Sequence, residues 1–502
     1  MALLILCNIG ARDVMWEDEN EKDEKKKLKT IEPPREGGER LLRELERDPG
    51  QAARLRFPIL EPCLRYLLSR HRAERPWQVI LFGTDQPDPK HRGSDTLHFA
   101  EIIARHLPGR LREAGFREDF RVEARRIEGI NPALYDEAFE AFGRLLPPLP
   151  EGFQHAYVIL AGGTPACNMG LLLQGIRRYG KRLRALYPPY GGEPHELRVG
   201  HQILQAFQEA AIRDRLQEGD FARAKALLRD LGAPPGLIAL AAYAARRMEF
   251  DFEGAREALD QAMREGDAAT RDFIRQRLLH DLDPLLGPGD PPRRWEALLR
   301  ELFWNARAAY RSGRYADFLG RVYRFQEALL RYLVETLLGL PTDLAREVRE
   351  ETRRRWEEGI RGNPALLRFL EQQEVEGQPL DWRQISRPTY KALLAFAIEK
   401  GGTDAEGRPL VPEGERGRYQ ALLKQVNQLD PLVERRHRTI IGHDFVGVSE
   451  EDLRAAYAPW REGKVDDPVE GLARILEMLR IDTRDDPYSA IADFIQRRLS
   501  EE

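Results

Sequence analysis

The sequence lacks long apolar runs, has few cysteines and carries almost no net charge, and each of these absences narrows the class of protein. No stretch of about 18 apolar residues occurs, so we expect no membrane-spanning helix and no membrane partner. Cys7, Cys63 and Cys167 do not stand at a metal-ligand or redox spacing, which favours a reducing, cytoplasmic setting. The formal net charge is only -4, so contact with nucleic acid would need a local basic patch.

The start of the chain, MALLILCNIG, also lacks the basic region and cleavage site of a secretory signal. We expect it to form a first β-strand instead. The chain has 502 residues, of which 42% are hydrophobic. That is enough for about three domains of roughly 150 residues each.

Residues 1–192 alternate apolar runs with helical patterns. The runs LLILCNIG (3–10), WQVILFGTDQ (77–86) and AYVILAGGTP (156–165) each end in small or polar residues and lead towards a helical segment. Strands that alternate with helices predict a Rossmann-like, doubly wound parallel sheet. Ligands of such sheets bind beyond the carboxyl ends of the strands, where these polar loops would lie.

The rest of the chain reads as helical. We predict a helical connector over residues 193–290 and an all-α domain over residues 291–502. The border falls at LLGPGDPPRR (285–294), because this stretch is rich in Pro and Gly. The predicted fold class is therefore multidomain, α/β followed by α.

The polar residues that follow the strands form the first candidate site. Gly162 and Gly163 permit close backbone approach to a ligand, while Thr164 and Asn168 stand at the start of a helix whose free N–H groups favour an anion. Ordinary strand-end turns would contain the same residue types, and this alternative stays open. The predicted ligand-binding residues are Asn8, Gly10, Arg12, Asp13, Thr84, Asp85, Gln86, Gly162, Gly163, Thr164, Asn168 and Met169.

Other chemistries fit this region less well. GGTPACNMG lacks the Gly-Lys-Ser/Thr ending of a Walker loop and the Gly-x-Gly-x-x-Gly fingerprint of a Rossmann dinucleotide site. Cys167 has no paired histidine in a recognisable pattern, so a buried small residue is the favoured interpretation. The histidines are scattered. We therefore expect no cofactor and no metal.

The second candidate site is RRHRTIIGHDF (435–445), in which four residues separate Arg438 from His443 and six separate Arg436 from His443. Histidine suits proton transfer near neutrality, and the arginine fork suits phosphate oxygens. The apolar pair Ile440–Ile441 is expected to face a core. A surface arginine and a hydrogen-bonded histidine near a helix end would show the same spacing, so the motif alone does not decide between these roles.

Together with SGRYADFLGRVYRFQEALLRYL (312–333), this motif resembles the HEPN ribonucleases, in which an Arg-x4–6-His motif on a late helix packs on an earlier helix pair. That family often has Asn directly after the Arg, whereas this chain has Thr439. The ordered segments CNIGARDV, LFGTDQ, SDTLHFAEII, INPALYD and LAGGTPACNMGL resemble a CARF domain. The combination is similar to the CARF–HEPN ribonucleases of type III CRISPR systems.

The resemblance implies an antiviral, metal-independent endoribonuclease that cuts single-stranded RNA and leaves a 2′,3′-cyclic phosphate. It places the catalytic roles on Arg438 and His443, with Thr439 and Arg436 as further candidates. The implied activator is a cyclic oligoadenylate, for which we favour the four-adenylate ring, and the implied assembly is a homodimer without stable association with the CRISPR effector complex. The CARF domain of some relatives also degrades the ring slowly.

Two alternatives to this activity remain open. The chain could be a non-catalytic nucleotide sensor whose helical part serves dimerisation or a partner, which the missing Asn favours. A CARF-coupled DNA nuclease is disfavoured, because the C-terminal half has no paired carboxylate-and-Lys motif.

Overall fold

The computed structural model describes residues 2–18, 28–71, 77–113, 115, 120–189, 192–287, 291–457 and 467–501. The chain forms two compact units, Met1–Gln208 and Glu209–Glu502. The division into three parts that the sequence suggested, with borders at 192 and 290, stays a prediction.

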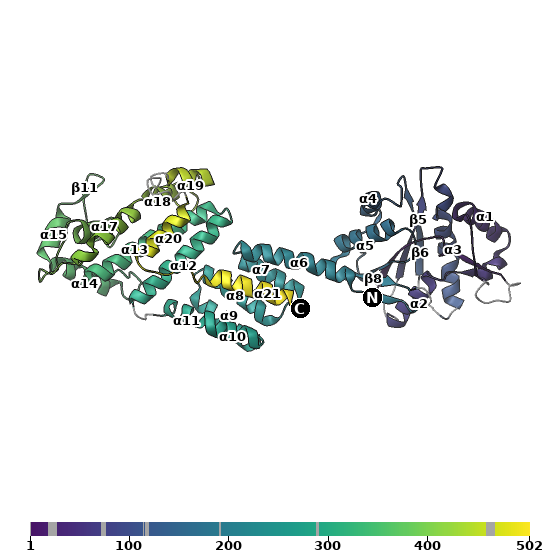
Figure 1. Ribbon diagram of the computed structural model, residues 1–502, viewed down its shortest axis with the longest axis horizontal. Helices are drawn as coiled ribbons and strands as arrows, with labels where there is room; N and C mark the ends of the chain where they lie inside the picture. Colours follow the sequence, from purple (N-terminus) through teal and green to yellow (C-terminus); the bar gives the residue numbers. More distant parts are fainter. Residues whose placement is uncertain are drawn as a thin grey trace. The chain divides into compact units, whose positions relative to one another are not determined.

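The first unit is built on a six-stranded sheet with the order β6-β5-β1-β7-β8-β9 (Figure 1). Neighbouring strands from β6 to β8 pair in parallel, and only β9 runs antiparallel to its neighbour β8. The strands are β1 (Ala2–Asn8), β5 (Trp77–Asp85), β6 (Phe120–Glu128), β7 (Phe153–Ile159), β8 (Leu183–Tyr187) and β9 (His195–Leu197). The predicted parallel sheet is confirmed.

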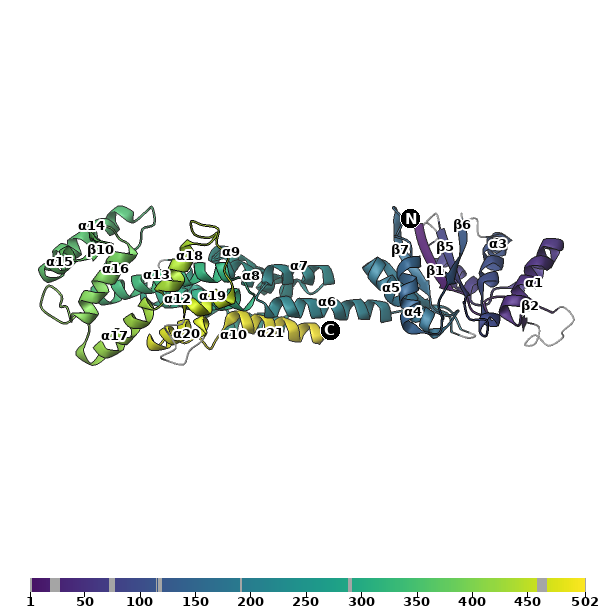
Figure 2. The ribbon, with the colours of Figure 1, turned by 90° about the horizontal axis from the view of Figure 1, so that it is seen from above.

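Helices cover both faces of this sheet (Figures 1 and 2). Leu3 and Ile5 of β1 point into the core shared with α1, α2 and α3, whereas Leu4 and Leu6 point into the core shared with α4 and α5. Because successive side chains of a strand alternate between faces, a strand buried on both sides is a continuous apolar run. The helices are α1 (Pro34–Arg47), α2 (Leu60–Arg70), α3 (Leu97–Glu113), α4 (Tyr135–Leu145) and α5 (Pro165–Tyr179).

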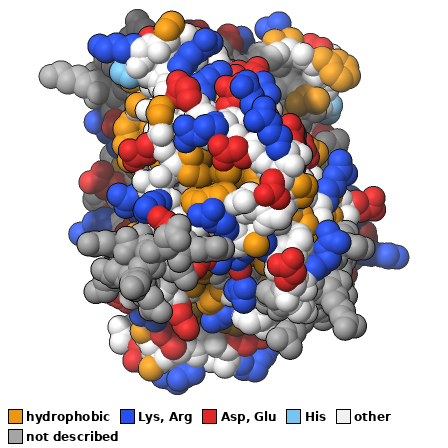
Figure 3. Space-filling model, turned by 90° about the vertical axis from the view of Figure 1, so that its right-hand side faces the viewer, with side chains coloured by type: hydrophobic (Ala, Val, Ile, Leu, Met, Phe, Trp, Pro, Cys, Tyr) orange, Lys and Arg blue, Asp and Glu red, His pale blue; other side chains and the backbone are white. Residues whose placement is uncertain are grey.

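A second, three-stranded sheet flanks the unit, in the order β3 (Leu28–Thr30), β2 (Met15–Glu17) and β4 (Leu55–Arg56). Helix α6 (Val199–Gln217) begins in the first unit and ends in the second. The face of the molecule in Figure 3 carries Lys and Arg interspersed with Asp and Glu, in keeping with the small net charge.

The second unit is almost entirely helical and has one continuous core. Its first helices are α7 (Phe221–Leu231), α8 (Pro235–Met248), α9 (Phe252–Glu265), α10 (Ala268–Arg277) and α11 (Leu279–Leu282). Asp220 and Asp251 cap α7 and α9 by accepting a backbone N–H three residues on. In both helices the capping aspartate stands directly before a phenylalanine, Phe221 or Phe252, that begins the helix.

The remaining helices are α12 (Pro291–Arg311), α13 (Tyr315–Leu338), α14 (Arg349–Arg361), α15 (Pro364–Glu371), α16 (Arg387–Leu394), α17 (Glu413–Asn427), α18 (Asp430–His437), α19 (Glu450–Ala456), α20 (Pro468–Met478) and α21 (Pro487–Ser500). A short hairpin, β10 (Glu374–Val375) and β11 (Gln378–Pro379), interrupts them. Helix α13 packs against α12, α16 and α18, and the last helix, α21, packs on α8. No helix in the described ranges is long and apolar enough to cross a membrane.

Candidate functional site

The first candidate site lies at the carboxyl edge of the large sheet, where the loops after β1 and β7 meet. A Cβ atom added to Gly10 would lie 2.6 Å from the backbone nitrogen of Gly163. A Cβ added to Gly162 would overlap the carbonyl oxygen of Asn8. Gly163 also has a φ of 74°, which favours glycine. Glycine at these positions therefore allows the backbones of the two loops to contact one another.

Two asparagines join the same loops. Asn8 Nδ2 donates a hydrogen bond to Asn168 Oδ1 over 2.9 Å. Asn8 is buried, and among the described residues its Oδ1 atom has no hydrogen-bond partner. Asn168 lies in the first turn of α5 and is half-buried. A buried acceptor without a partner calls for an explanation, and a ligand donor at this edge would satisfy it.

Asp13 lies directly behind these loops and is fully buried. Its Oδ2 accepts a 2.7 Å hydrogen bond from the backbone N–H of Gly10. Burial raises the pKa of the Asp13 carboxyl to about 7, although the Gly10 hydrogen bond acts in the opposite direction. Asp13 therefore contributes to loop packing and is shielded from solvent.

The N-terminus of α5 completes this edge. Thr164 is its N-cap, accepting a 3.1 Å hydrogen bond from the Cys167 N–H, and its hydroxyl donates to the Pro132 carbonyl. The Thr164 hydroxyl is thus engaged within the unit. Met169 is 47% exposed and Arg12 is exposed, so both can meet a ligand. The positive end of the helix dipole favours an anion here.

Thr84 and Gln86, at and just beyond the end of β5, bond inside the unit. The Thr84 N–H donates to Thr96 Oγ1, and the Thr96 N–H donates back to Thr84 Oγ1, over 3.2 and 3.1 Å. Gln86 Nε2 donates to Asp95 Oδ1 over 3.0 Å. All four side chains are buried. Thr96, the partner of Thr84, also donates from its Oγ1 to the Ile9 carbonyl over 2.8 Å, so this network reaches the residue after Asn8.

Asp85 belongs to the same internal network. Arg35 of α1 bonds Asp85 and Asp95 through one nitrogen, with both oxygens 2.8 Å away. The ion pairs raise the pKa of Arg35, chiefly through the hydrogen bond to Asp85. Arg35 was not found by sequence reasoning, because it stands 50 residues before Asp85 and belongs to no local motif.

The second candidate site is the turn after α18. The family resemblance implied a late helix for the motif that contains Arg438 and His443, but α18 ends at His437 and both residues follow it. The Gly442 N–H then bonds the Thr439 carbonyl over 2.8 Å, and the His443 N–H bonds the His437 carbonyl over 2.9 Å. These bonds replace helical ones and fold the chain back over the helix end.

Side chains on this turn differ from expectation in two further respects. Ile440 is 74% exposed, so the expectation that it faces a core is wrong, whereas Ile441 is half-buried. Thr439 is only 1% exposed, and its hydroxyl donates to the Arg436 carbonyl over 2.8 Å. Thr439 stabilises the turn and offers no hydroxyl to a substrate.

The turn stacks two histidines. The rings of His437 and His443 lie 5.7 Å apart between centroids with an interplanar angle of 8°. Tyr323 of α13 meets the His437 ring edge-on, with centroids 6.1 Å apart. His443 is exposed and His437 is half-buried. The sequence did not mark His437 as a partner of His443, because two histidines six positions apart give no sign of stacking.

Two arginines at this turn carry charge without a carboxylate partner among the described residues. The Arg436 guanidinium lies 4.8 Å above the Tyr323 ring, and Arg438 is exposed. The neighbouring Arg435, by contrast, forms an ion pair with Asp452. The net local charge at Arg436 and Arg438 is therefore positive, which suits a phosphate.

His437 titrates below its ordinary range. Burial lowers its pKa most, followed by the charges of Arg436, His443 and Arg387, while Glu434 acts in the opposite direction. His437 is thus neutral near pH 7 and can accept a proton.

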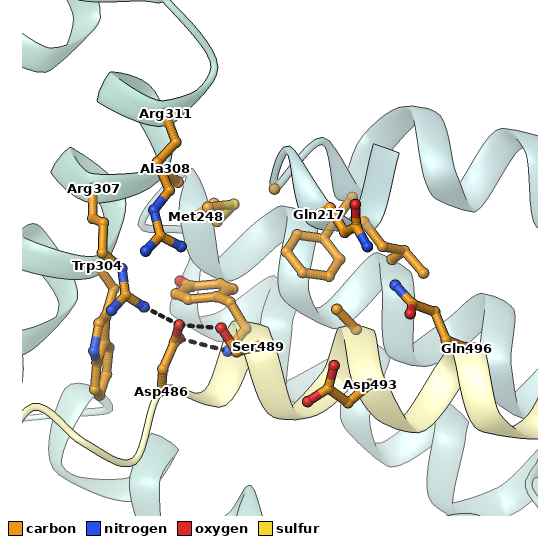
Figure 4. Close-up of a pocket in the computed structure, with 15 residues that line it drawn as sticks. Gln217, Met248, Trp304, Arg307, Ala308, Arg311, Asp486, Ser489, Asp493 and Gln496 are labelled. Carbon is orange, nitrogen blue, oxygen red and sulfur yellow. Dashed lines mark hydrogen bonds and ion pairs between the residues drawn. The ribbon is translucent and has the colours of Figure 1, made fainter. Parts of the chain in front are cut away.

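A cavity of about 260 Å³ lies elsewhere in the helical unit, between α6, α7, α12 and α21 (Figure 4). Arg307 forms an ion pair with Asp486, which also accepts from Ser489 Oγ. These three polar side chains in the cavity wall are therefore hydrogen-bonded or ion-paired to one another. In the described part of the chain, no group of three or more His, Cys, Asp or Glu is placed to hold a metal ion.

No protein-family model matches the chain, and neither does any curated protein sequence. Among solved structures, the chain is similar to Csm6 of Enterococcus italicus bound to cyclic hexa-2′-fluoro-hexa-dAMP. The two share 11% sequence identity and a TM-score of 0.48, over 100% of this chain and 99% of the other.

Proposed function

We propose that the chain is a CARF–HEPN endoribonuclease that cuts single-stranded RNA without a metal, is activated by a cyclic oligoadenylate and acts in type III CRISPR antiviral defence. The observation that carries the proposal is the turn after α18, where an exposed His443 stands beside cations that lack carboxylate partners among the described residues. The ordered motifs of the sequence supply the second support.

The proposed chemistry needs only groups found at this turn. The RNA 2′-hydroxyl attacks the adjacent phosphorus, the bond to the 5′-oxygen breaks, and the products are a 2′,3′-cyclic phosphate and a 5′-hydroxyl. His443 takes part in proton transfer. Arg436 and Arg438 hold the phosphate oxygens and stabilise the charge that develops on them.

The sheet edge of the first unit is the proposed sensor. Asn8 and Asn168 present amide groups to the adenine or ribose, and the N-terminus of α5 faces a phosphate. Arg12 and Met169 are exposed beside them. We favour a ring of four adenylates and a homodimer, because a two-fold ring suits two copies of the same edge. The same loops are proposed to cut the ring slowly.

RNA cleavage by the purified chain tests the proposal. Labelled single-stranded RNA is incubated in EDTA with no ring, with cyclic tetra-adenylate or with cyclic hexa-adenylate. We expect ring-dependent cleavage that EDTA leaves unchanged and that His443→Ala reduces at least about 100-fold. Loss of all activity in EDTA would contradict the metal-free mechanism, and full activity of His443→Ala would contradict the site.

A non-catalytic sensor is the second candidate, favoured by the buried Thr439 hydroxyl where relatives often have Asn. It predicts that the ring binds and that neither RNA nor DNA is cut. The His443→Ala chain also serves to look for linear products of the ring, which separates slow ring cleavage from RNA cleavage.

A further inference from the structure

His437 and His443 are held together by the backbone as well as by their rings. The His443 N–H donates to the His437 carbonyl, and the loop between them closes over Gly442. A Cβ on Gly442 would lie 2.6 Å from the His437 carbonyl oxygen, so this tight return needs glycine. The stack is therefore a built feature of the turn.

The arginine beside His437 favours one of its two ring nitrogens as the basic atom. Arg436 Nη1 lies 3.5 Å from His437 Nδ1, and an arginine N–H can only donate. A lone pair on Nδ1 of the neutral ring is the arrangement that fits this neighbour. A contact of 3.5 Å is long for a hydrogen bond, so a bound phosphate can replace it. Arg436 would then hold a phosphate oxygen beside the basic nitrogen.

We infer that His437 is a second catalytic residue, which accepts the proton of the attacking 2′-hydroxyl while His443 protonates the leaving 5′-oxygen. This inference rests on the proposed ribonuclease function and goes beyond it by assigning the base. The 2′-oxygen forms a bond to phosphorus, the bond to the 5′-oxygen breaks, and one proton passes to His437 Nδ1 as another leaves His443. Solvent then restores both protonation states.

Distance and charge support this pairing. Each imidazole must come within about 2.6–3.2 Å of its oxygen, so two rings 5.7 Å apart can serve the two oxygens on either side of one phosphorus. Burial disfavours a charge on His437 most, Arg436, His443 and Arg387 also disfavour it, and Glu434 favours it. The neutral ring is the state that a base requires. Tyr323 positions both His437 and Arg436 through ring contacts.

A change of the leaving group in the RNA substrate distinguishes loss of the catalytic base from loss of the catalytic acid. A 5′-bridging phosphorothiolate RNA has a sulfur leaving group that needs no protonation, so loss of the acid is rescued on this substrate and loss of the base is not. We compare His437→Gln and His443→Gln on normal and sulfur-substituted RNA, with His280→Gln as a control at an exposed histidine of α11. Thermal unfolding and ring binding check that each variant is folded.

We expect the cleavage rate of His437→Gln to fall at least about 100-fold on both RNAs. The cleavage rate of His443→Gln should fall as much on normal RNA and recover on the sulfur substrate. The pH–rate profile of His437→Gln should also lack the acidic limb of the wild-type profile. Rescue of His437→Gln by sulfur, or its activity within about threefold of wild type on normal RNA, would overturn the inference. A wild-type chain that cuts neither RNA would instead refute the proposed function itself.

Discussion

Asp13 is a single carboxyl group whose burial makes the stability of the first unit depend on pH. Its ordinary pKa is near 3.8, and burial raises it to about 7 in the folded chain. Between these values the unfolded chain has lost its proton and the folded chain keeps it. The folded state therefore binds more protons, and its stability falls as the pH rises from about 4 to about 7.

The substitution Asp13→Asn should remove this pH dependence. Asn keeps an oxygen that can accept the Gly10 N–H but does not ionise. A shift of about three pKa units corresponds to at most about 4 kcal/mol, so the variant should be the more stable chain at pH 8 and lose its advantage near pH 4. Urea unfolding at pH 4, 6 and 8 measures the difference. Parallel curves for the two chains would contradict the buried, protonated carboxyl.

Residue-level reasoning from sequence found only part of the first site. Asn8 and Asn168 do meet, because parallel strands deliver consecutive loops to the same edge of a sheet. Thr84 instead bonds Thr96. Asp85 bonds Arg35, which comes from a helix that lies between β1 and β5 in the sequence. Partners supplied by distant elements leave no local pattern in the sequence.

At the scale of elements, periodicity located the helices better than it located their ends. The pattern of apolar residues continues past His437, yet α18 stops there. Consecutive β-branched residues at 439–441 are weak helix formers. The buried Thr439 hydroxyl also bonds a backbone carbonyl, which competes with the helix. The stacking of His437 on His443 follows from that early end and could not be read from the spacing.

Helices α8, α12 and α21 are joined by a buried charged network. Arg247 is 1% exposed and bonds Glu301 through two nitrogens, over 3.0 and 2.8 Å. Burial works against the Arg247 charge, but the facing Glu301 carboxylate raises the pKa of Arg247 well above its ordinary value. Tyr488 of α21 donates to the same Glu301. The last helix is thereby fixed onto the helices that precede residue 290.

Glu301→Gln should destabilise the helical unit strongly, because it removes the main partner of the buried Arg247 charge and leaves that charge with the ion pair to Asp281. Loss of one member of a buried pair costs about 3–5 kcal/mol. The matched control is Arg354→Ala, which removes the exposed ion pairs with Glu351 and Glu358 and should leave unfolding unchanged within error. Urea unfolding followed by circular dichroism compares the two variants. Equal effects would show that the buried network adds no stability.

At the scale of the whole chain, the sequence predicted the order of α/β and helical parts correctly. It did not predict that the last helix returns to α8, since nothing in residues 487–500 marks their partner. Helices on both sides of the Pro- and Gly-rich stretch at 285–294 consequently share one core. The Pro- and Gly-rich composition predicted a boundary here, whereas burial decides which helices share a core.

The proposed homodimer raises the question whether each chain cuts RNA with its own histidines. Because His437 and His443 stack within one chain, we expect a wild-type subunit to stay active beside an inactive partner. Wild type is co-expressed with about a tenfold excess of the double variant His437→Gln/His443→Gln, and cleavage is counted per wild-type chain. If the acid and base came from different subunits, about nine tenths of the wild-type chains would face a defective partner and the rate would fall about tenfold.

A second mixture of variants tests whether the base and the acid can come from different chains. His437→Gln and His443→Gln, co-expressed in equal amounts, place one intact histidine of each kind in every mixed dimer. Activity would return only if base and acid act across the two-fold axis. We expect no recovery of activity, because each chain of the mixed dimer lacks one histidine of its own stacked pair. The dimer would then serve to bind the ring and the RNA, while the turn after α18 in each chain performs the proton transfers alone.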